Sequence, residues 1–362
     1  MHPAQRPGPK ENTCLALPFG AKRPLRQTLP KCPLFAENAR IENSMDKFEI
    51  LFGSNPVLQV LVPFITVALP MLFLFAYATF GFMVGSLEIK GARSGRALFD
   101  RAAKQLATAG LVLGWTLLIG SRVWLFVQSE GYVPQSFLAV VVELSWGVFG
   151  FAVIASSIHF AVWKPLANHK IGHAFLAYFS GINGLFALFA LMGAIRLMAA
   201  AELPNAAQLS LNDIYNFSQV PSPQIAALAL ILPLGLAVPP LAAICWIFVR
   251  RQKEDYGRDY YNALVKWCAS WGLVFWPLVT LVLAGTAWMD IRPLLGAATP
   301  VAPMALVEPT VRVLLPLVIC LVLWLTKRAE LPMRMKPYLI VCFFLALGAS
   351  HYLYTCATGF VF

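Results

Sequence analysis

Eight long apolar stretches dominate the chain, and shorter polar segments separate them. An α-helix needs roughly 20 apolar residues to cross a bilayer core of about 30 Å, and each stretch is of about that length or longer. The pattern therefore predicts an all-α integral membrane protein with eight transmembrane helices. The stretches lie at 57–87, 105–127, 137–163, 174–200, 224–249, 267–289, 303–326 and 338–361. Prolines in the first and fifth stretches predict kinks or tilts, at Pro63 and Pro70 and at Pro233, Pro239 and Pro240.

Lys and Arg residues alternate between the connecting segments. Sixteen of them lie in segments 88–104, 164–173, 250–266 and 327–337, whereas segments 128–136, 201–223 and 290–302 together hold one. Because cytoplasmic loops are enriched in Lys and Arg, the first group is predicted to be cytoplasmic. Eight spans then place the start of the first helix and the C-terminus outside. We expect the membrane to be the cytoplasmic (inner) membrane of a bacterium.

Composition agrees with a lipid environment and excludes several classes of site. The chain is 59% hydrophobic and 12% charged, whereas a soluble domain is about one-half apolar and one-quarter charged. The net charge of +11 does not predict nucleic-acid binding, because the cations lie between apolar stretches and no binding motif is present. The seven cysteines form no CxxC spacing, so no metal site, iron–sulfur cluster or covalently attached haem is predicted.

The N-terminal residues 1–44 do not fit this topology. They contain seven Lys or Arg residues and many prolines, yet the topology places them outside, and they lack the apolar core of a signal peptide. Two interpretations stay open. Residues 1–44 are a disordered basic tail, or translation begins at Met45 and the upstream start is misassigned.

The two halves of the chain resemble each other. Residues 95–112 align without a gap with residues 257–274, with matching Gly, Arg, Lys, Ala, Gly, Leu and Val positions. Landmarks in flanking helices keep nearly the same offset, pairing Pro70 with Pro233, Gly120 with Gly285, and Glu143 with Glu308. An offset that spans four helices predicts two parallel four-helix repeats, 45–200 and 224–362, joined by an outer loop at 201–223.

Ionisable residues inside the predicted spans are candidates for function, because a charge in lipid is costly unless it is paired or hydrated. Glu143 lies 21 residues before Lys164, so about 31 Å from the cytoplasmic end of its helix. Arg122 and Arg196 end their helices at a similar level, and Arg312 shares the outer part of its helix with Glu308. We expect Glu143 to pair with Arg122 or Arg196 beside a polar pocket that opens to the outer side. The alternatives are snorkelling of the arginines and an i,i+4 pair between Glu308 and Arg312.

The histidines limit what can be said of a haem. His159 lies five residues before Lys164, and His351 lies 15 residues after Lys336, so their depths differ by roughly 15 Å. Two axial ligands of one haem need similar depths, which makes this pair a poor bis-histidine site. His351 is a candidate ligand of a single b-type haem, His159 is a weaker candidate with helix packing as its alternative role, and His169 and His173 are expected in a solvated loop.

The connector Gly95–Lys104 and the run 137–150, which carries Glu143, resemble the corresponding parts of membrane subunit I of the cytochrome bd-type quinol oxidases. The resemblance implies eight spans, a quinol site near the outer face, and Glu143 as a proton or polar-pocket residue. The family's histidines of helices 1 and 5 are missing here, and the segment 201–223 is shorter than the family's quinol-binding loop. The resemblance therefore implies one b-type haem or none.

Three functions follow as expectations. The first is a membrane electron-transfer subunit, an oxidoreductase component that reacts with quinone or quinol and exchanges electrons with a partner protein. The second is a solute transporter or channel, because duplicated helical bundles also build those proteins. The third is a non-catalytic anchor in a larger membrane complex, in which the polar residues only join helices.

Overall fold

A computed structural model describes residues 68–128, 137–201, 229–254, 256–295 and 303–358 of the chain. The segments 1–44 and 202–223, as well as Pro63, lie outside the described residues. Within the described ranges the chain is helical and forms no strand. Eight helical segments there are long and apolar enough to cross a membrane, which confirms an all-α membrane protein. The helices are α3 (Leu69–Ala78), α4 (Phe80–Ser94), α5 (Ala97–Gln128), α6 (Phe137–Ala161), α7 (Lys170–Ala201), α10 (Ile231–Arg250), α11 (Arg258–Leu295), α12 (Pro303–Arg328), the short 3₁₀ helix η4 (Pro332–Met335) and α13 (Lys336–Thr358).

Several helices extend beyond the apolar stretches that predicted them. Helix α5 begins eight residues earlier than expected, and α11 both begins earlier and ends later. The added turns carry charged residues, so a search for apolar runs does not include these turns. They are nevertheless packed, since Tyr260 and Tyr261 in the first turn of α11 are both buried. An apolar stretch therefore marks the part of a helix in lipid, whereas backbone hydrogen bonding continues past it.

The first span is interrupted, but not at a proline. Pro70 lies in the first turn of α3, where the missing N–H costs no helical hydrogen bond. The turn before Pro70 lies outside the described residues, so the kink or tilt predicted there stays a prediction, and the break that the structure shows lies at Thr79, between α3 and α4. The Thr79 hydroxyl donates a hydrogen bond to the Gly235 carbonyl of α10 over 2.5 Å. In the fifth span, Pro239 and Pro240 lie inside a continuous helix α10.

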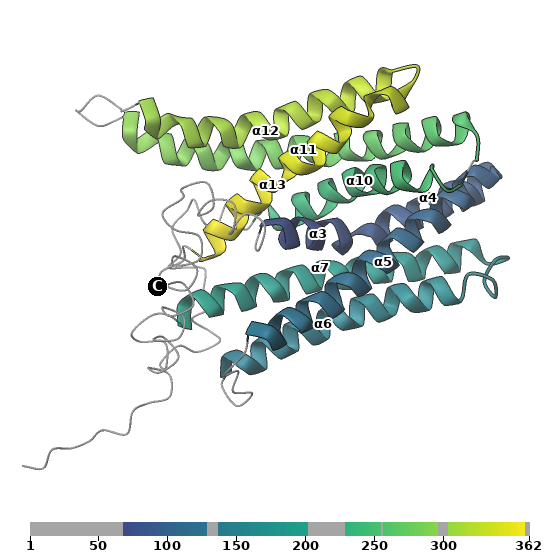
Figure 1. Ribbon diagram of the computed structural model, residues 1–362, viewed down its shortest axis with the longest axis horizontal. Coiled ribbons are helices and arrows are strands. Elements are labelled where there is room, and N and C mark those ends of the chain that lie inside the picture. Colours follow the sequence, from purple (N-terminus) through teal and green to yellow (C-terminus); the bar gives the residue numbers. More distant parts are fainter. Residues whose placement is uncertain (1–67, 129–136, 202–228, 255, 296–302, 359–362) are drawn as a thin grey trace, which may run out of the picture. The chain divides into compact units, whose positions relative to one another are not determined.

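The helices pack in two groups of four (Figure 1). In the first group, α4 and α6 each pack against both α5 and α7. In the second group, α10 and α12 each pack against both α11 and α13. Helix α3 contacts α5 and α7 of the first group and α10 and α13 of the second, and so joins the two groups. A second connection is polar, because Gln105 of α5 donates a hydrogen bond to Glu254 and accepts one from Tyr260 of α11.

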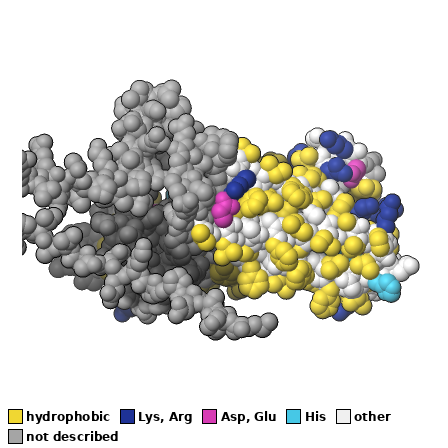
Figure 2. All heavy atoms as spheres, turned by 90° about the horizontal axis from the view of Figure 1, so that it is seen from below, with side chains coloured by type: hydrophobic (Ala, Val, Ile, Leu, Met, Phe, Trp, Pro, Cys, Tyr) yellow, Lys and Arg dark blue, Asp and Glu magenta, His cyan; other side chains and the backbone are white. Residues whose placement is uncertain are grey.

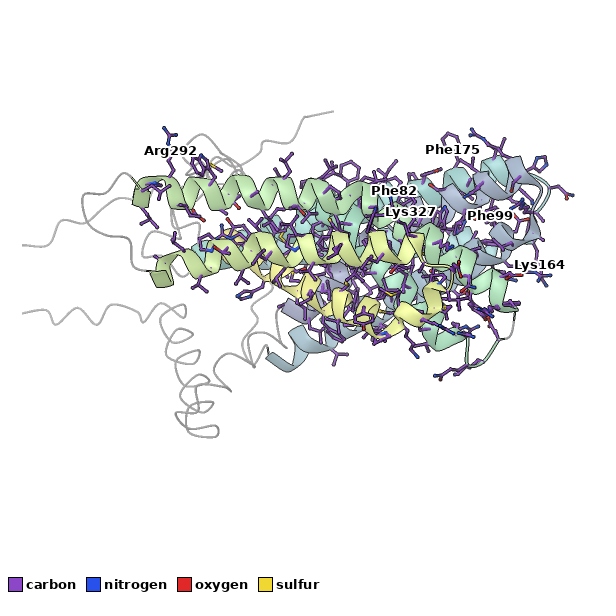
Figure 3. The ribbon with its side chains drawn as sticks, turned by 90° about the horizontal axis from the view of Figure 1, so that it is seen from above. Phe82, Phe99, Lys164, Phe175, Arg292 and Lys327 are labelled. Carbon is purple, nitrogen blue, oxygen red and sulfur yellow. The ribbon has the colours of Figure 1, made fainter. Side chains whose placement is uncertain are left out.

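The face of the helices that Figure 2 shows is largely hydrophobic, and most of its Lys and Arg side chains gather at one end. We call this the basic end; the connectors α4–α5, α6–α7, α10–α11 and α12–α13 lie there. Figure 3 places Phe99 and Lys164 at this end and Arg292 at the opposite one. Many large apolar side chains are exposed, as a lipid-facing surface requires, and they include Leu144, Phe175, Phe186 and Leu281.

Helices α3 and α4 approach α7 along a seam of small residues. A methyl group added at Gly81 would overlap the backbone of Ala177 and Gly181, and one added at Gly184 would overlap the carbonyl oxygen of Ala78. Small residues allow helix backbones to come this close within a membrane. We call this contact the glycine seam; it joins α7 to α3 at Gly184 and to α4 at Gly81.

Candidate functional site: a buried Glu–His–His cluster

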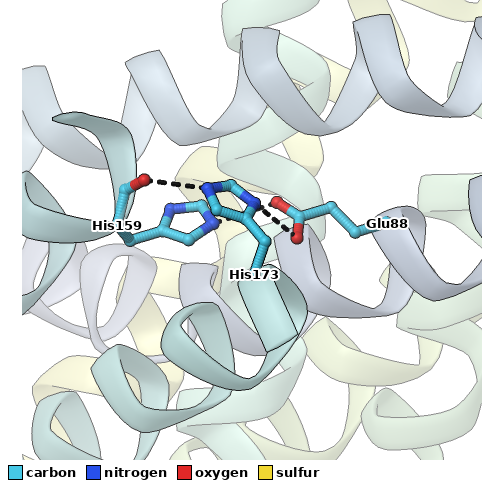
Figure 4. Close-up of side chains that lie close together, drawn as sticks. All are labelled: Glu88, His159 and His173. Atoms are coloured by element: carbon cyan, nitrogen blue, oxygen red, sulfur yellow. Dashed lines mark hydrogen bonds and ion pairs between the residues drawn. The ribbon is translucent and has the colours of Figure 1, made fainter. Parts of the chain in front are cut away.

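Three ionisable side chains meet near the basic end of the first helix group, one each from α4, α6 and α7 (Figure 4). Glu88 Oε1 lies 2.9 Å from His159 Nε2, and Glu88 Oε2 lies 2.9 Å from His173 Nδ1. The two imidazole rings stack with their centroids 4.2 Å apart. One carboxylate therefore bridges two histidines that come from different helices.

The cluster is almost fully removed from solvent. Glu88, His159 and His173 expose only 4%, 3% and 5% of their surface. Burial of a carboxyl group is costly unless its oxygens are hydrogen-bonded, and here both oxygens have an imidazole partner. The cost of holding this group inside the bundle makes the cluster a candidate for function rather than ordinary packing.

One contact fixes the tautomer of His173. Its Nε2 lies 2.9 Å from the backbone carbonyl oxygen of His159. A carbonyl oxygen can only accept, so Nε2 carries the hydrogen and donates it. The other nitrogen, Nδ1, faces Glu88 Oε2, and one hydrogen lies between these two atoms, carried by either the imidazole or the carboxyl group. This arrangement is typical of a metal-binding histidine, whose second ring nitrogen donates to a carbonyl or carboxylate.

The glycine seam brings two of these residues together. Glu88 follows Gly81 and Gly85 at spacings of four and three, so all three share one face of α4. His173 precedes Ala177 and Gly181 at spacings of four on the facing side of α7. Glu88 therefore lies one helical turn beyond the seam on α4, and His173 lies one turn beyond it on α7, both toward the basic end.

Neighbouring contacts enclose the cluster. Trp163 lies edge-on to both rings, with centroid distances of 5.6 Å to His159 and 4.7 Å to His173. One turn beyond Glu88, Gly91 leaves room for the carboxylate of Asp100 from α5. Asp100 in turn accepts a hydrogen bond from Lys170 of α7. An aromatic ring and an ion pair therefore hold the ends of α4, α5, α6 and α7 around the cluster.

A small cavity adjoins the cluster on the side away from the basic end. The space in it open to a water-sized molecule is about 20 Å³, and its lining includes His159, Ser156 and Ser180. This is room for a single water molecule with polar partners. The Ser156 hydroxyl is hydrogen-bonded to Ser180 at 2.5 Å and to Tyr77 at 3.0 Å. Polar groups thus continue from the cluster into the interior of the first helix group.

The structure corrects one expectation about the histidines. His173 was expected in a solvated loop with His169, but it is buried in the first turn of α7, whereas His169 is exposed in the connector. The polar run around Lys170 suggested a loop, because the sequence does not reveal that α7 starts at Lys170. His159, a weaker candidate from sequence, is a central member of the cluster.

Glu88 is the residue that sequence reasoning missed. It was assigned to a basic connector, because Lys and Arg residues follow it closely. Helix α4 continues to Ser94 and ends at Gly95, whose φ of 64° is a left-handed conformation that glycine adopts readily. The spacing of Glu88 from Gly81 and Gly85 was the available signal. No ligand spacing within a short segment could have revealed the site, because 85 positions separate Glu88 from His173.

The predicted polar residues near the opposite end form separate contacts. Arg122 of α5 donates a hydrogen bond to Glu143 of α6, so these two residues do pair. Their side chains are 48% and 35% exposed, and the Arg122 guanidinium also lies 5.1 Å from the Trp146 ring centroid. Arg196 lies in α7, but its side chain is outside the described residues.

Arg312 forms the second group, in the other half of the chain. Its guanidinium donates to Glu308, as the i,i+4 spacing predicted, and to Asp290 of α11 over 2.6 Å. It also lies 3.8 Å from the ring centroid of Tyr352 in α13, and its side chain is only 7% exposed. His351, the first candidate for a haem ligand, lies on an exposed face of α13. The Arg312 group joins α11, α12 and α13, none of which holds Glu88, His159 or His173, whereas Glu143 shares α6 with His159.

Comparison of the chain with protein-family models, with curated proteins and with solved structures finds no match. The functional assignment therefore rests on the geometry of the site.

Proposed function

We propose that this chain is a membrane metalloprotein in which Glu88, His159 and His173 bind one divalent transition-metal ion. The observation that carries this proposal is the convergence of three buried ligand groups from three helices. Their ligand atoms all lie within 4.8 Å of one another. Bonds of about 2.0–2.2 Å to a tetrahedral ion would place ligand atoms about 3.4 Å apart, so small side-chain movements suffice.

The ligand set favours particular ions. Two imidazoles and one carboxylate are the ligands of catalytic zinc sites and of non-haem iron(II) sites, and both keep one or more positions open. Calcium and magnesium prefer oxygen ligands and do not fit two histidines. The water-sized cavity beside His159 supports an open position for a water ligand. The bound ion would replace the hydrogen that Glu88 and His173 share.

An iron or copper ion at this site would supply the electron-transfer function expected from the cytochrome bd resemblance. We propose that such a centre exchanges electrons with a quinol that approaches from the bilayer at the level of the cluster, rather than near the outer face, and with a redox partner protein, and that no haem bound by His351 is needed. Tyr77, Ser156 and Ser180 extend the polar groups from the cluster toward the bilayer interior, on the side from which a quinol would approach.

Transport is the less favoured alternative. In transporters built from repeats, the substrate site lies between the repeats near the middle of the membrane. The Glu–His–His cluster instead lies inside the first helix group, near its basic end, with Trp163 against both imidazole rings. This position favours a resident ion over a transported one.

We also propose that the chain is a parallel duplication whose basic end faces the cytoplasm. Gly95 and Gly257, equivalent in the sequence alignment, both have positive φ, at 64° and 83°, and are the two such residues in the described ranges. Each precedes the second helix of its group, and the two groups pack their helices in the same order. The cluster belongs to the first half alone, since Arg250, Trp324 and Tyr338 occupy the matching region of the second.

Metal content of the purified full-length chain tests the proposal. Protein stripped with a chelator is titrated with Co²⁺, a coloured probe for sites that bind zinc or iron. We expect one Co²⁺ ion per chain and an absorption spectrum typical of nitrogen and oxygen ligands. Loss of an outer-shell partner already costs 10–100-fold in affinity, so Glu88→Gln, His159→Gln and His173→Gln should each weaken binding by more than about 100-fold.

The matched control is His169→Gln, which removes an exposed histidine at the same end and should leave Co²⁺ binding unchanged. Thermal unfolding of each variant shows whether the bundle remains folded. A chain that binds no Co²⁺, or a folded His173→Gln variant that binds it as well as the parent protein, would rule out the proposed centre.

A further inference from the structure

A second polar site lies between α4 and α7, on the outside of the first helix group at the basic end. It is an open pocket of about 360 Å³. Its lining consists of Ser86, Ile89, Lys90, Arg93 and Ser94 from α4 and Tyr178 from α7. None of these residues belongs to the Glu–His–His cluster, so what the pocket binds is independent of the proposed metal centre.

The pocket has the chemistry of an anion site. Ser86, Lys90 and Arg93 follow one another at spacings of four and three, so they lie on one face of α4. The hydroxyl groups of Ser86 and Tyr178 are hydrogen-bonded to each other at 3.0 Å and join the two helices. Among the described lining residues two are cationic, three carry hydroxyl groups and none is acidic.

Contacts with aromatic rings position the groups of the pocket. The Lys90 ammonium lies 4.6 Å from the centroid of the Phe99 ring of α5, a favourable cation–π position. Tyr178 lies against Phe82 of α4, with ring centroids 5.9 Å apart. The Lys90 ammonium and the Tyr178 hydroxyl are therefore placed by packing.

An apolar track leads from this pocket along α7. Phe175, Phe179, Ile182 and Phe186 are spaced at four, three and four residues, so they share one face of the helix, and Tyr178 lies beside it. All four are exposed, from 44% for Ile182 to 72% for Phe175. A polar pocket next to an exposed apolar track matches a molecule with an anionic head and long hydrocarbon chains. A soluble anion would contact the pocket alone.

We propose that this pocket binds the phosphate group of an anionic phospholipid, with its acyl chains along the Phe175–Phe186 face of α7. Lys90 and Arg93 neutralise the phosphate charge. Of the hydrogen-bonded Ser86 and Tyr178 hydroxyls, the one that accepts from the other keeps its own hydrogen free and donates it to a phosphate oxygen. Basic pockets between transmembrane helices on the cytoplasmic side favour such headgroups, which is the side we assign to the basic end. The lipid then bridges α4 and α7, the two helices that position Glu88 and His173.

Native mass spectrometry of the purified full-length chain tests this proposal. Delipidated protein is titrated with phosphatidylglycerol, which is anionic, and with phosphatidylcholine, which has no net charge. We expect at least a tenfold preference for phosphatidylglycerol at one site. Lys90→Gln with Arg93→Gln should weaken that binding by about tenfold or more, because each cation near the surface contributes about 1 kcal/mol.

The control pair is Lys253→Gln with Arg258→Gln, which removes one exposed Lys and one exposed Arg from the α10–α11 connector. An equal loss with this pair would mean that binding reflects only the total charge of the basic end, and would overturn the proposal. So would equal affinity for the two lipids. Displacement of the lipid by millimolar inorganic phosphate would show a site for soluble phosphate instead.

A second variant isolates the hydroxyl groups. Tyr178→Phe keeps the ring that packs against Phe82 and removes only the hydroxyl that faces Ser86. We expect a smaller loss of phosphatidylglycerol affinity, about threefold to tenfold, with thermal stability in detergent maintained. Unchanged affinity in both this variant and the Lys90–Arg93 pair would reject the pocket as the binding site.

Discussion

At the scale of single residues, burial decides how much an ion pair contributes to the stability of the fold. Arg122 and Arg312 were both predicted from their positions within apolar stretches, and each pairs with at least one carboxylate. Arg122 is half exposed, whereas Arg312 is enclosed by α11, α12 and α13. The i,i+4 contact between Arg312 and Glu308 followed from spacing alone. Its contacts with Asp290 and Tyr352 could not be predicted, because they depend on how three helices pack.

The two arginines should therefore differ in their contribution to stability. Arg312→Gln leaves the carboxylates of Asp290 and Glu308 without their cation, and we expect a loss of about 2–3 kcal/mol. Arg122→Gln removes an exposed pair and should cost less than about 1 kcal/mol. Chemical unfolding in detergent, followed by tryptophan fluorescence, measures both. Equal losses would mean that burial does not separate the two ion pairs.

At the scale of helices, the sequence predicted which segments are helical but not how close they come. Apolar stretches located all eight spans, because lipid demands long apolar helices. The ends were less predictable, since backbone hydrogen bonding in α5 and α11 continues into charged turns. The glycine seam was also not predicted, because a glycine in an apolar run does not reveal which helix it faces. Glu88 and His173 were missed for the same two reasons.

The seam makes a direct prediction about stability. Gly184→Ala adds a methyl group that overlaps the Ala78 carbonyl, so α3 and α7 must move apart. We expect a loss of about 2–3 kcal/mol, at the upper part of the range for overpacked interiors. Thermal unfolding in detergent measures this change.

Gly120→Ala is the matched control, because nothing lies within 4 Å of a methyl group at Gly120 in α5. Alanine is the better helix former, so this variant should be as stable as the parent chain or slightly more stable. A Gly184→Ala variant that behaves like Gly120→Ala would contradict a close contact between α7 and α3.

At the scale of the whole molecule, the charges of the connectors are the basis for predicting the orientation in the membrane. The basic end was predicted from the alternation of Lys and Arg between connectors, and the structure places these connectors together. The sequence similarity of the halves predicts a duplication, which stays a prediction; the structure shows that the two groups pack their helices in the same order. The Glu–His–His cluster was beyond prediction at this scale, because it occurs in one half and has no equivalent in the other.

Reporter fusions test the orientation. Alkaline phosphatase is active only outside the cytoplasm, and green fluorescent protein made in the cytoplasm fluoresces only there. We expect fusions after Lys253 to fluoresce without phosphatase activity, because this connector carries four Lys or Arg residues within 250–258. Fusions after Phe362 should show the reverse. The opposite pattern at both positions would place the basic end outside.

The origin of the cluster from three helices also has a consequence for synthesis on the ribosome. Glu88 is made 85 residues before His173, its partner. At about 5–20 residues per second, the carboxylate waits roughly 4–17 s before that partner exists. A carboxylate in mid-membrane would have to be buried in lipid during this interval, whereas Glu88 lies near the end of α4 and can stay in contact with water at the basic end. The position of the cluster close to the basic end thus allows the first span to be inserted long before the cluster can close.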